Sequence, residues 1–193
     1  MNYKMMGKFI SQILFVEAAF MLPALLISVL ERNIPGIWGF ALSIVITAAV
    51  ASVLYVLCRH AVRRFYAREG LVCVGMSWIF MSLLGCLPFF MSGEIPNFLD
   101  ALFEIVSGFT TTGASVLSNV EGLSKGILYW RSFSHWLGGM GVLVFLLAVG
   151  ERGDKGSGFT LHLLRAESPG PTVGKLVPKM RTTARILYMM YIL

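Results

Sequence analysis

Long apolar stretches, separated by short polar segments, dominate the pattern of this sequence. Four of them are long enough to cross the roughly 30 Å hydrocarbon core of a bilayer, which takes about 20 helical residues. The four stretches are Phe9–Leu30, Ile37–Leu57, Leu71–Met91 and Leu128–Val149. A further apolar run begins near Ala184 and continues to Leu193. The pattern predicts an all-α protein that crosses a membrane several times.

Another apolar segment, Phe98–Phe109, is too short to cross. At about 1.5 Å per helical residue it extends roughly 18 Å, about half of a membrane. Asn97 is a suitable N-cap, and Asp100 lies in the first turn, where a negative charge suits the helix dipole. We expect Gly108 to let the helix end. The hydroxyl-rich segment Thr110–Ser115 follows directly.

The basic residues of the loops predict the orientation, because loops rich in Lys and Arg stay in the cytoplasm. Basic residues gather before the first stretch, between the second and third, and after the fourth. They are Lys4 and Lys8; Arg59, Arg63, Arg64 and Arg68; and Arg152, Lys155, Arg165, Lys175, Lys179, Arg181 and Arg185. With the N-terminus in the cytoplasm, residues 93–126 must enter and leave on the external side. Phe98–Phe109 is therefore predicted to be a re-entrant helix.

Composition supports a membrane protein and argues against nucleic-acid binding. Hydrophobic residues make up 56% of the chain and charged residues 13%, against about 25% charged residues in a typical soluble domain. The net charge of +6 comes from residues between apolar stretches, not from one polar face. The first apolar stretch exceeds the roughly 7–15 residues of a signal-peptide core. A retained first span is therefore expected.

Thr110–Ser115 carries the most specific candidate chemistry. Irregular backbone at membrane depth is tolerated only where protein buries it or water reaches it. An oxygen-rich strand there can replace the water around a cation, and Gly113 permits a positive φ that turns carbonyls toward one axis. The helix C-terminus before it carries partial negative charge, which favours a cation over an anion. The alternative interpretation is an ordinary glycine-containing turn at a helix end.

A few polar residues within the apolar stretches have two interpretations each. Glu17 lies near the middle of the first span, where a carboxyl is a functional candidate; the favoured alternative is a group that packs against another helix. Arg131 and His135 lie one turn apart in the fourth stretch. They either shape the electric field at a pore mouth or pair with a carboxylate such as Glu104 or Glu121.

The remaining small residues indicate packing and not catalysis. Gly138–Gly141 is a cluster that lets helices approach closely within a membrane, and we expect it to pack against the re-entrant helix or a neighbouring span. Cys58, Cys73 and Cys86 lie in or beside apolar stretches without Cys-x-x-Cys spacing, which is typical of small packing residues. The sequence contains no Walker or HExxH motif, and we do not expect an enzyme.

Taken together, several motifs resemble the Trk/Ktr/HKT family of potassium-uptake proteins, most closely its bacterial TrkH/TrkG branch. The motifs are Phe103–Ser115, Trp130–Ser132, His135–Gly141 and Ala166–Pro171. The resemblance implies a fold of four non-identical helix–pore loop–helix repeats around one pore. It also implies that Thr111, Thr112 and Gly113 coordinate K⁺. Thr110, Ala114 and Ser115 would flank them. K⁺ would be the transported ion, and no organic cofactor is expected.

The same resemblance divides the chain into three parts. Residues 1–66 are expected to form two leading transmembrane helices. Residues 67–150 would form the first repeat, with a pore helix at about 97–109 and a filter at 110–115. Residues 151–193 would form a cytoplasmic linker and the truncated start of a second repeat. With one pore loop where the family has four, the chain is expected to be an N-terminal fragment of a longer protein.

The resemblance further implies a location and partners. We expect a multi-pass protein of the bacterial inner membrane, a homodimer of the full-length protein, and a cytosolic TrkA-type nucleotide-binding regulatory subunit that meets residues 150–181. Coupling of K⁺ symport to protons or sodium stays open. The alternatives are a non-conducting truncated membrane subunit and a secondary transporter of another small solute, which would use a broken helix at the midplane.

Overall fold

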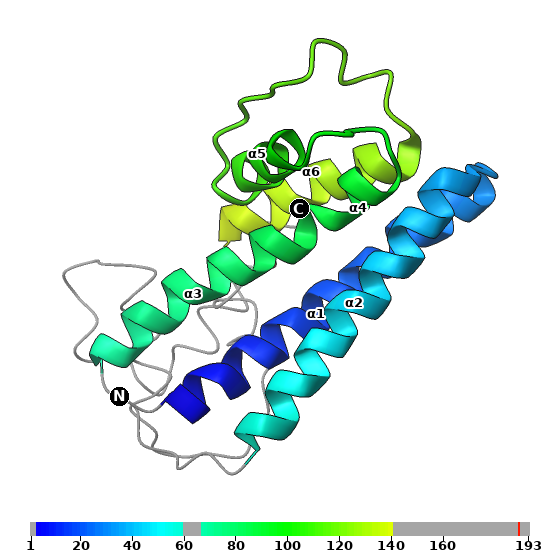
Figure 1. Ribbon diagram of the computed structural model, residues 1–193. Coiled ribbons are helices and arrows are strands. Elements are labelled where there is room, and N and C mark those ends of the chain that lie inside the picture. The colour runs from blue at the N-terminus through cyan, green and yellow to red at the C-terminus, as the bar shows by residue number, and fades with distance from the viewer. Residues whose placement is uncertain (1–2, 60–66, 141–188, 190–193) are drawn as a thin grey trace.

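All regular secondary structure in the described part of the chain is α-helical. The computed structural model describes residues 3–59, 67–140 and 189, and Figure 1 shows their arrangement. The helices are α1 (Tyr3–Leu30), α2 (Ile34–Cys58), α3 (Ala67–Gly85), α4 (Leu87–Met91), α5 (Phe98–Phe109) and α6 (Lys125–Met140). The all-α prediction is confirmed for these residues.

Three helical segments of the described residues are long and apolar enough to cross a membrane. They are α1, α2 and the segment Val72–Met91, which correspond to the first three predicted spans. Helix α6 covers the start of the fourth predicted span, and residues 141–149 lie outside the described residues. The predicted linker at 150–181 lies outside them too, as does all but Met189 of the apolar run from Ala184.

Helices α1 and α2 form a hairpin that runs alongside α3 (Figure 1). The turn is tight because Arg32 adopts a φ of 56° and Asn33 caps α2, its side-chain oxygen accepting a hydrogen bond from the Gly36 N–H at 3.2 Å. Within the apolar helices, hydroxyl groups bond to backbone carbonyls one turn earlier, as Ser43 does to Gly39 at 2.7 Å. Polar side chains that lie in a bilayer are satisfied inside their own helix in this way.

The third predicted span is broken and not continuous. Helix α3 ends at Gly85, and α4 resumes at Leu87. Pro88 lacks an N–H and cannot continue the hydrogen-bond ladder back to Leu84. The Gly85 carbonyl at the break instead accepts a hydrogen bond from Trp130 Nε1 of α6 at 2.9 Å. The break therefore gives α6 a fixed contact point on the third span.

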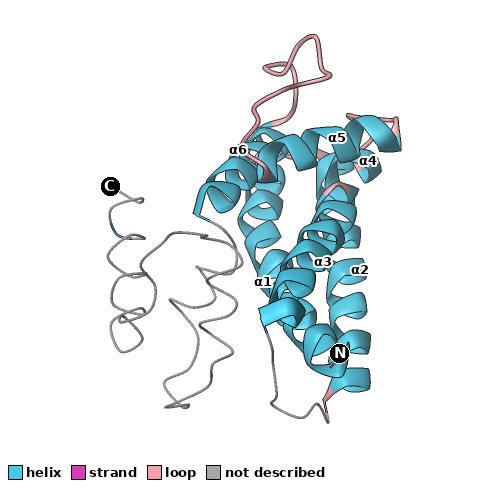
Figure 2. Cartoon of the chain, turned by 90° about the vertical axis from the view of Figure 1, so that its left-hand side faces the viewer, coloured by secondary structure: helices cyan, strands magenta, loops and turns pink. Residues whose placement is uncertain are grey.

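Helices α5 and α6 lie across one end of α3, as Figures 1 and 2 show. The core between them is apolar and aromatic, with Trp130, Phe89 and Ile105 fully buried. Phe133 of α6 lies within a cluster of rings, and its ring centroid is 4.9 Å from that of Phe20 in α1. Helix α1 of the leading hairpin therefore packs against α6.

Polar groups at the α5–α6 end tie three segments together. Glu31, after α1, accepts a hydrogen bond from the Lys125 N–H at 3.0 Å. Glu94, before α5, accepts one from the Ser124 N–H at 2.8 Å. Carboxylates placed at a helix N-terminus stabilise its unpaired N–H groups and its dipole. These contacts fix the start of α6 against the ends of α1 and α4.

Candidate functional site

Helix α5 begins as the sequence predicts. The Asn97 side chain accepts a hydrogen bond from the Leu99 N–H at 3.0 Å, and Asp100 lies in the first turn. Its C-terminus differs from the prediction, because Gly108 is still helical and the helix ends at Phe109. The expectation that Gly108 releases the helix is therefore wrong. Gly108 instead gives room to Ser134 of α6, whose hydroxyl would collide with any side chain added there.

The helix end is a Schellman cap built on threonines. The Thr111 N–H donates to the Gly108 carbonyl at 2.9 Å, and the Thr112 N–H donates to the Ser107 carbonyl at 3.0 Å. This pair of bonds defines the motif, which usually has glycine at the left-handed position. Here that position is Thr111, with a φ of 54°. A β-branched residue at positive φ is a backbone outlier, so the start of the following segment is strained.

The six residues Thr110–Ser115 have exposed side chains. The Thr110 hydroxyl donates to the Val106 carbonyl at 2.8 Å. Its single proton is thereby used, so the Thr112 hydroxyl donates to Thr110 Oγ1 at 2.8 Å. Gly113 has a φ of +74°, in the region that the sequence analysis expected. No donor among the described residues reaches the carbonyls of Thr111, Thr112 or Gly113.

Glu104 of α5 holds the far end of this segment. Its side chain is fully buried. Oε1 accepts hydrogen bonds from Ser115 Oγ at 2.6 Å and from the Val116 N–H at 2.7 Å. Oε2 accepts from Arg131 Nε of α6 at 2.9 Å, which is also an ion pair. One carboxylate thus joins α5, α6 and the segment between them.

The charged form of Glu104 is favoured despite its position. Burial disfavours the carboxylate, but the hydrogen bonds from Ser115, Arg131 and the Val116 N–H, with the charge of Arg131, outweigh it. Together they hold the pKa of the Glu104 carboxyl below its usual range. Glu104 and Glu121 were the two carboxylates predicted as possible partners of Arg131. The structure places Glu104 beside Arg131, whereas Glu121 is exposed.

His135 bonds to its own helix. Its Nδ1 lies 2.9 Å from the Arg131 carbonyl, and a carbonyl only accepts, so the ring proton is on Nδ1. Ser134 Oγ donates to the same carbonyl at 2.7 Å. The His135 ring therefore helps to hold the backbone of Arg131 in place.

Glu17 of α1 lies near the last turn of α5. It is fully buried, and neither of its carboxyl oxygens has a hydrogen-bond partner among the described residues. A side-chain carbon added at Gly85 would lie 2.7 Å from Glu17 Oε1, 3.2 Å from Ile105 and 3.3 Å from Phe109. The absence of a side chain at Gly85 therefore makes room for Glu17 beside the last turn of α5.

Helix α6 contacts the end of α5 through Gly138. A side-chain carbon at that position would collide with the carbonyl group of Phe109. The glycine thus permits the close backbone approach that small residues allow in membranes. Of the two partners expected for this cluster, the re-entrant helix or a neighbouring span, Gly138 contacts the re-entrant helix.

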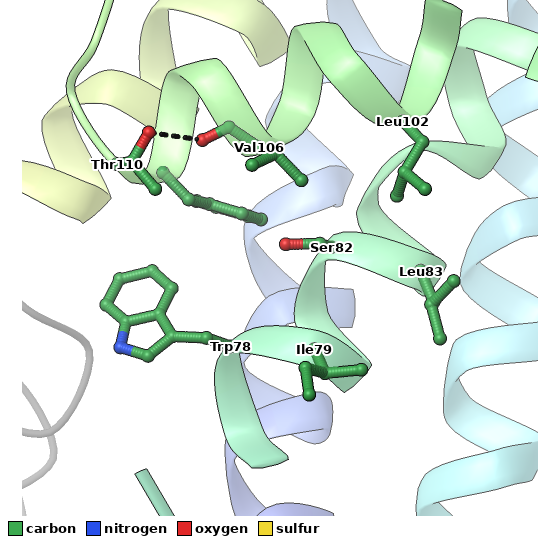
Figure 3. A pocket seen from close by; sticks show the side chains of 8 residues that line it. Trp78, Ile79, Ser82, Leu83, Leu102, Val106 and Thr110 are labelled. Carbon is green, nitrogen blue, oxygen red and sulfur yellow. Dashed lines mark hydrogen bonds between the residues drawn. The ribbon is translucent and has the colours of Figure 1, made fainter. Parts of the chain in front are cut away.

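Figure 3 shows a hollow between α3 and α5, close to Thr110. Its volume is about 320 Å³, and its lining residues are Trp78, Ile79, Ser82, Leu83, Leu102, Val106, Phe109 and Thr110. Trp78 and Phe109 meet there, with ring centroids 5.9 Å apart. No ionisable side chain lines the hollow, and its walls are almost entirely apolar, whereas a site for a small polar solute carries several converging polar groups.

Sequence reasoning missed several contacts of this site. Ser107 Oγ donates to the Ala114 carbonyl at 2.5 Å, and Trp130 bonds to Gly85. A signal for the first was present, since Glu104, Ser107 and Gly108 form a polar and small stripe at helical spacing on an otherwise apolar helix. Such a stripe marks the face that contacts other backbone.

The fold and the site define a polytopic α-helical membrane protein, in which a half-length helix ends in a strand with exposed carbonyl groups. The family described as "TrkH: Cation transport protein" matches residues 38–193. The chain belongs to this family, which consists of transport proteins and not enzymes. The family resemblance inferred from the motifs is confirmed.

Relatives named as potassium uptake proteins match along almost the whole chain. The "Trk system potassium uptake protein TrkH" of Halomonas elongata is 34% identical over 194 residues, which cover 99% of this chain and 39% of that protein. The "Trk system potassium uptake protein TrkG" of Escherichia coli K12 is 32% identical over 177 residues, covering 89% of this chain and 35% of the relative. The chain therefore spans about two fifths of the length of these relatives.

A solved structure shares the fold. The crystal structure of the potassium transporter TrkH from Vibrio parahaemolyticus matches with a TM-score of 0.77 and 28% sequence identity. The match covers 100% of this chain and 37% of that one. The arrangement of helices described above is thus the arrangement found in this part of a TrkH protein.

Proposed function

We propose that this chain supplies one ion-coordinating strand of a bacterial potassium-uptake protein. In this proposal the oxygens of Thr111, Thr112 and Gly113 replace water around K⁺ as it passes. Thr110, Ala114 and Ser115 flank them. The observation that carries the proposal is the set of exposed carbonyls at Thr111–Gly113, which no described donor engages.

The electrostatics of the site suit a cation. Backbone carbonyls are the ligands that potassium filters use in place of hydration water. The C-terminal end of α5, which carries a partial charge of roughly −0.5, leads directly into the strand. No Arg or Lys lies within Thr110–Ser115, where a positive charge would repel the ion.

One strand supplies oxygen ligands on one side of an ion only. The family fold implied by the resemblance places four such loops around the pore. Relatives named as potassium uptake proteins are more than twice as long as the segment that they share with this chain. We therefore propose that residues 1–66 are leading helices, 67–150 the first repeat, and 151–193 the linker to a second.

The location and the partners of the protein are proposed from the same family resemblance. We propose an inner-membrane location with a cytoplasmic N-terminus, a dimer of the complete protein, and a TrkA-type nucleotide-binding partner on the cytoplasmic face. A secondary transporter of a small polar solute is less favoured, because the hollow beside Thr110 has apolar walls.

The proposal is tested by uptake in cells that lack their own potassium transporters and carry the complete native gene. Gly113→Asp puts a side chain at a φ of +74° and a carboxylate into the strand. We expect it to abolish growth at low potassium and ⁸⁶Rb⁺ uptake. Gly93→Asp is the matched control, since Gly93 has a φ of +76° outside the strand, and neither glycine has a neighbour within 4 Å.

Membrane levels of both variants are compared by immunoblot. The expected result is loss of uptake in Gly113→Asp, with uptake largely kept in Gly93→Asp at equal protein level. Undiminished uptake in Gly113→Asp would sink the assignment of the strand.

A further inference from the structure

The two ends of the strand are held by different kinds of bond. At the helix end, the N–H groups of Thr111 and Thr112 bond to backbone carbonyls of α5. At the outer end, side chains of α5 do the holding: Ser107 bonds to the Ala114 carbonyl, and Glu104 bonds to Ser115 and the Val116 N–H. Between these anchors, no described hydrogen bond engages the Thr112 carbonyl or the backbone of Gly113.

The outer anchor is built to stay in place. Glu104 is fully buried, and all its bonds have distances of 2.6–2.9 Å. Arg131, whose side chain is 17% exposed, supplies the charge that a buried carboxylate needs to stay ionised. The Arg131 backbone is in turn held by Ser134 and His135. A displacement of this anchor would be transmitted to the carbonyls at Thr112 and Gly113.

We propose that Glu104 is a specificity-determining residue, which together with Arg131 fixes Ser115 and Val116 against the pore helix and so sets the spacing of the carbonyls at Thr112–Gly113 for K⁺ over Na⁺. The proposal rests on the proposed function of that strand. Glu104 does not touch the ion and acts through the backbone that it positions. Preference between cations depends on the number, spacing and rigidity of the oxygens that replace hydration water.

Two substitutions separate the parts of the anchor. In Glu104→Gln the amide oxygen still accepts from Ser115 and Val116, but the NH₂ group faces the Nε–H of Arg131, and two donors cannot bond. Ser115→Ala removes one bond to Oε1 and leaves the ion pair intact. Ser132→Ala and Ser118→Ala are matched controls, because both hydroxyls are exposed and lie outside the anchor.

The test measures uptake of K⁺, Rb⁺ and Na⁺ by proteoliposomes that contain the complete native protein. We expect Glu104→Gln and Ser115→Ala each to lower the K⁺/Na⁺ ratio by roughly fivefold, the factor that corresponds to about one hydrogen bond. Potassium uptake should continue in both. The two control variants should keep the ratio of the unsubstituted protein.

The outcomes distinguish this proposal from the proposed function. If Gly113→Asp does not reduce uptake, the strand assignment fails. If Gly113→Asp abolishes uptake but Ser115→Ala and Glu104→Gln change the overall rate with an unaltered K⁺/Na⁺ ratio, Glu104 has a structural role only and the proposal is overturned. If Glu104→Gln does not reach the membrane, the ratio in Ser115→Ala decides.

Discussion

Two fully buried carboxyl groups lie at the C-terminal half of the same short helix, and their surroundings are opposite. Glu104 faces the strand end and has donors from Ser115, Val116 and Arg131. Glu17 reaches the last turn of α5 from α1, and neither oxygen has a described hydrogen-bond partner. Burial of a charge is costly unless the charge is paired. The site of Glu104 therefore requires a carboxylate, whereas at the site of Glu17 the size and shape of the side chain matter more than its charge.

The largest expected effect comes from removal of the paired carboxylate. Glu104→Ala leaves the Arg131 guanidinium without its counter-charge, which costs about 3–5 kcal/mol in the free energy of unfolding. Thermal unfolding of the purified protein in detergent measures it. The double variant Glu104→Met/Arg131→Met should recover most of the loss, because apolar residues replace both charges. An equal loss in the single and double variants would contradict the pairing.

The second prediction concerns the shape of the Glu17 site. Gly85→Ala adds a carbon that would lie 2.7 Å from Glu17 Oε1, and we expect a loss of about 1–3 kcal/mol in stability from overpacking. Gly75→Ala on the same helix is the control, since nothing lies within 4 Å of that position. The Gly85 variant should lose less in a Glu17→Ala background. Equal unfolding temperatures for the two glycine variants would show that Glu17 does not occupy this space.

The third prediction uses pH at the paired site. The pKa of Glu104 is lowered in the folded protein, so the unfolded chain binds a proton more readily. The stability from Glu104 is thus fully present above the usual Glu range of about 4.3 and is lost as pH falls through the lower folded pKa. Unfolding curves measured across acid pH should show this loss, and Glu104→Gln should remove that part of it. A pH profile that Glu104→Gln leaves unaltered would contradict the assignment.

The smallest expected effect is an amide at the unpaired site. Glu17→Gln keeps the shape and breaks no described hydrogen bond, so unfolding free energy should change by no more than about 1 kcal/mol. Glu104→Gln, which sets two donors against each other, should lose more. Equal losses in these two isosteric variants would remove the contrast between the sites.

Much of the helical layout could be predicted from the sequence, because apolar length is a local property. The first three spans follow from the apolar length, and the Asn97 cap of α5 follows from the type of residue that precedes the short apolar segment. The break after Gly85 does not, because proline alone is ambiguous: Pro23 lies inside the continuous α1, whereas Pro88 follows a break. The indole N–H of Trp130, which donates a hydrogen bond to the Gly85 carbonyl, is distant from Gly85 in the sequence.

The residues of the candidate site and its Arg131–Glu104 pair could be predicted, but most of its other contacts could not. Thr110–Ser115 could be identified from hydroxyls and one glycine after a half-length helix. The left-handed position at Thr111 was not expected, because glycine is the usual choice there and Gly108 was nearby. Tertiary packing decides this, since Gly108 gives room to Ser134 of α6.

The central claim, that the carbonyls of Thr111–Gly113 coordinate K⁺, is most directly tested at Gly113 itself. Gly113–Ala114 is the single Gly-Ala pair in the 193-residue sequence. Labelling with carbonyl-¹³C glycine and ¹⁵N alanine restricts solid-state NMR spectra of the complete native protein in lipid to the carbonyls of Gly-Ala pairs. The signal that is lost in Gly113→Ser belongs to the Gly113 carbonyl. We predict a saturable shift of this resonance when Na⁺ is replaced by K⁺; an unchanged resonance in protein that takes up K⁺ would contradict the account.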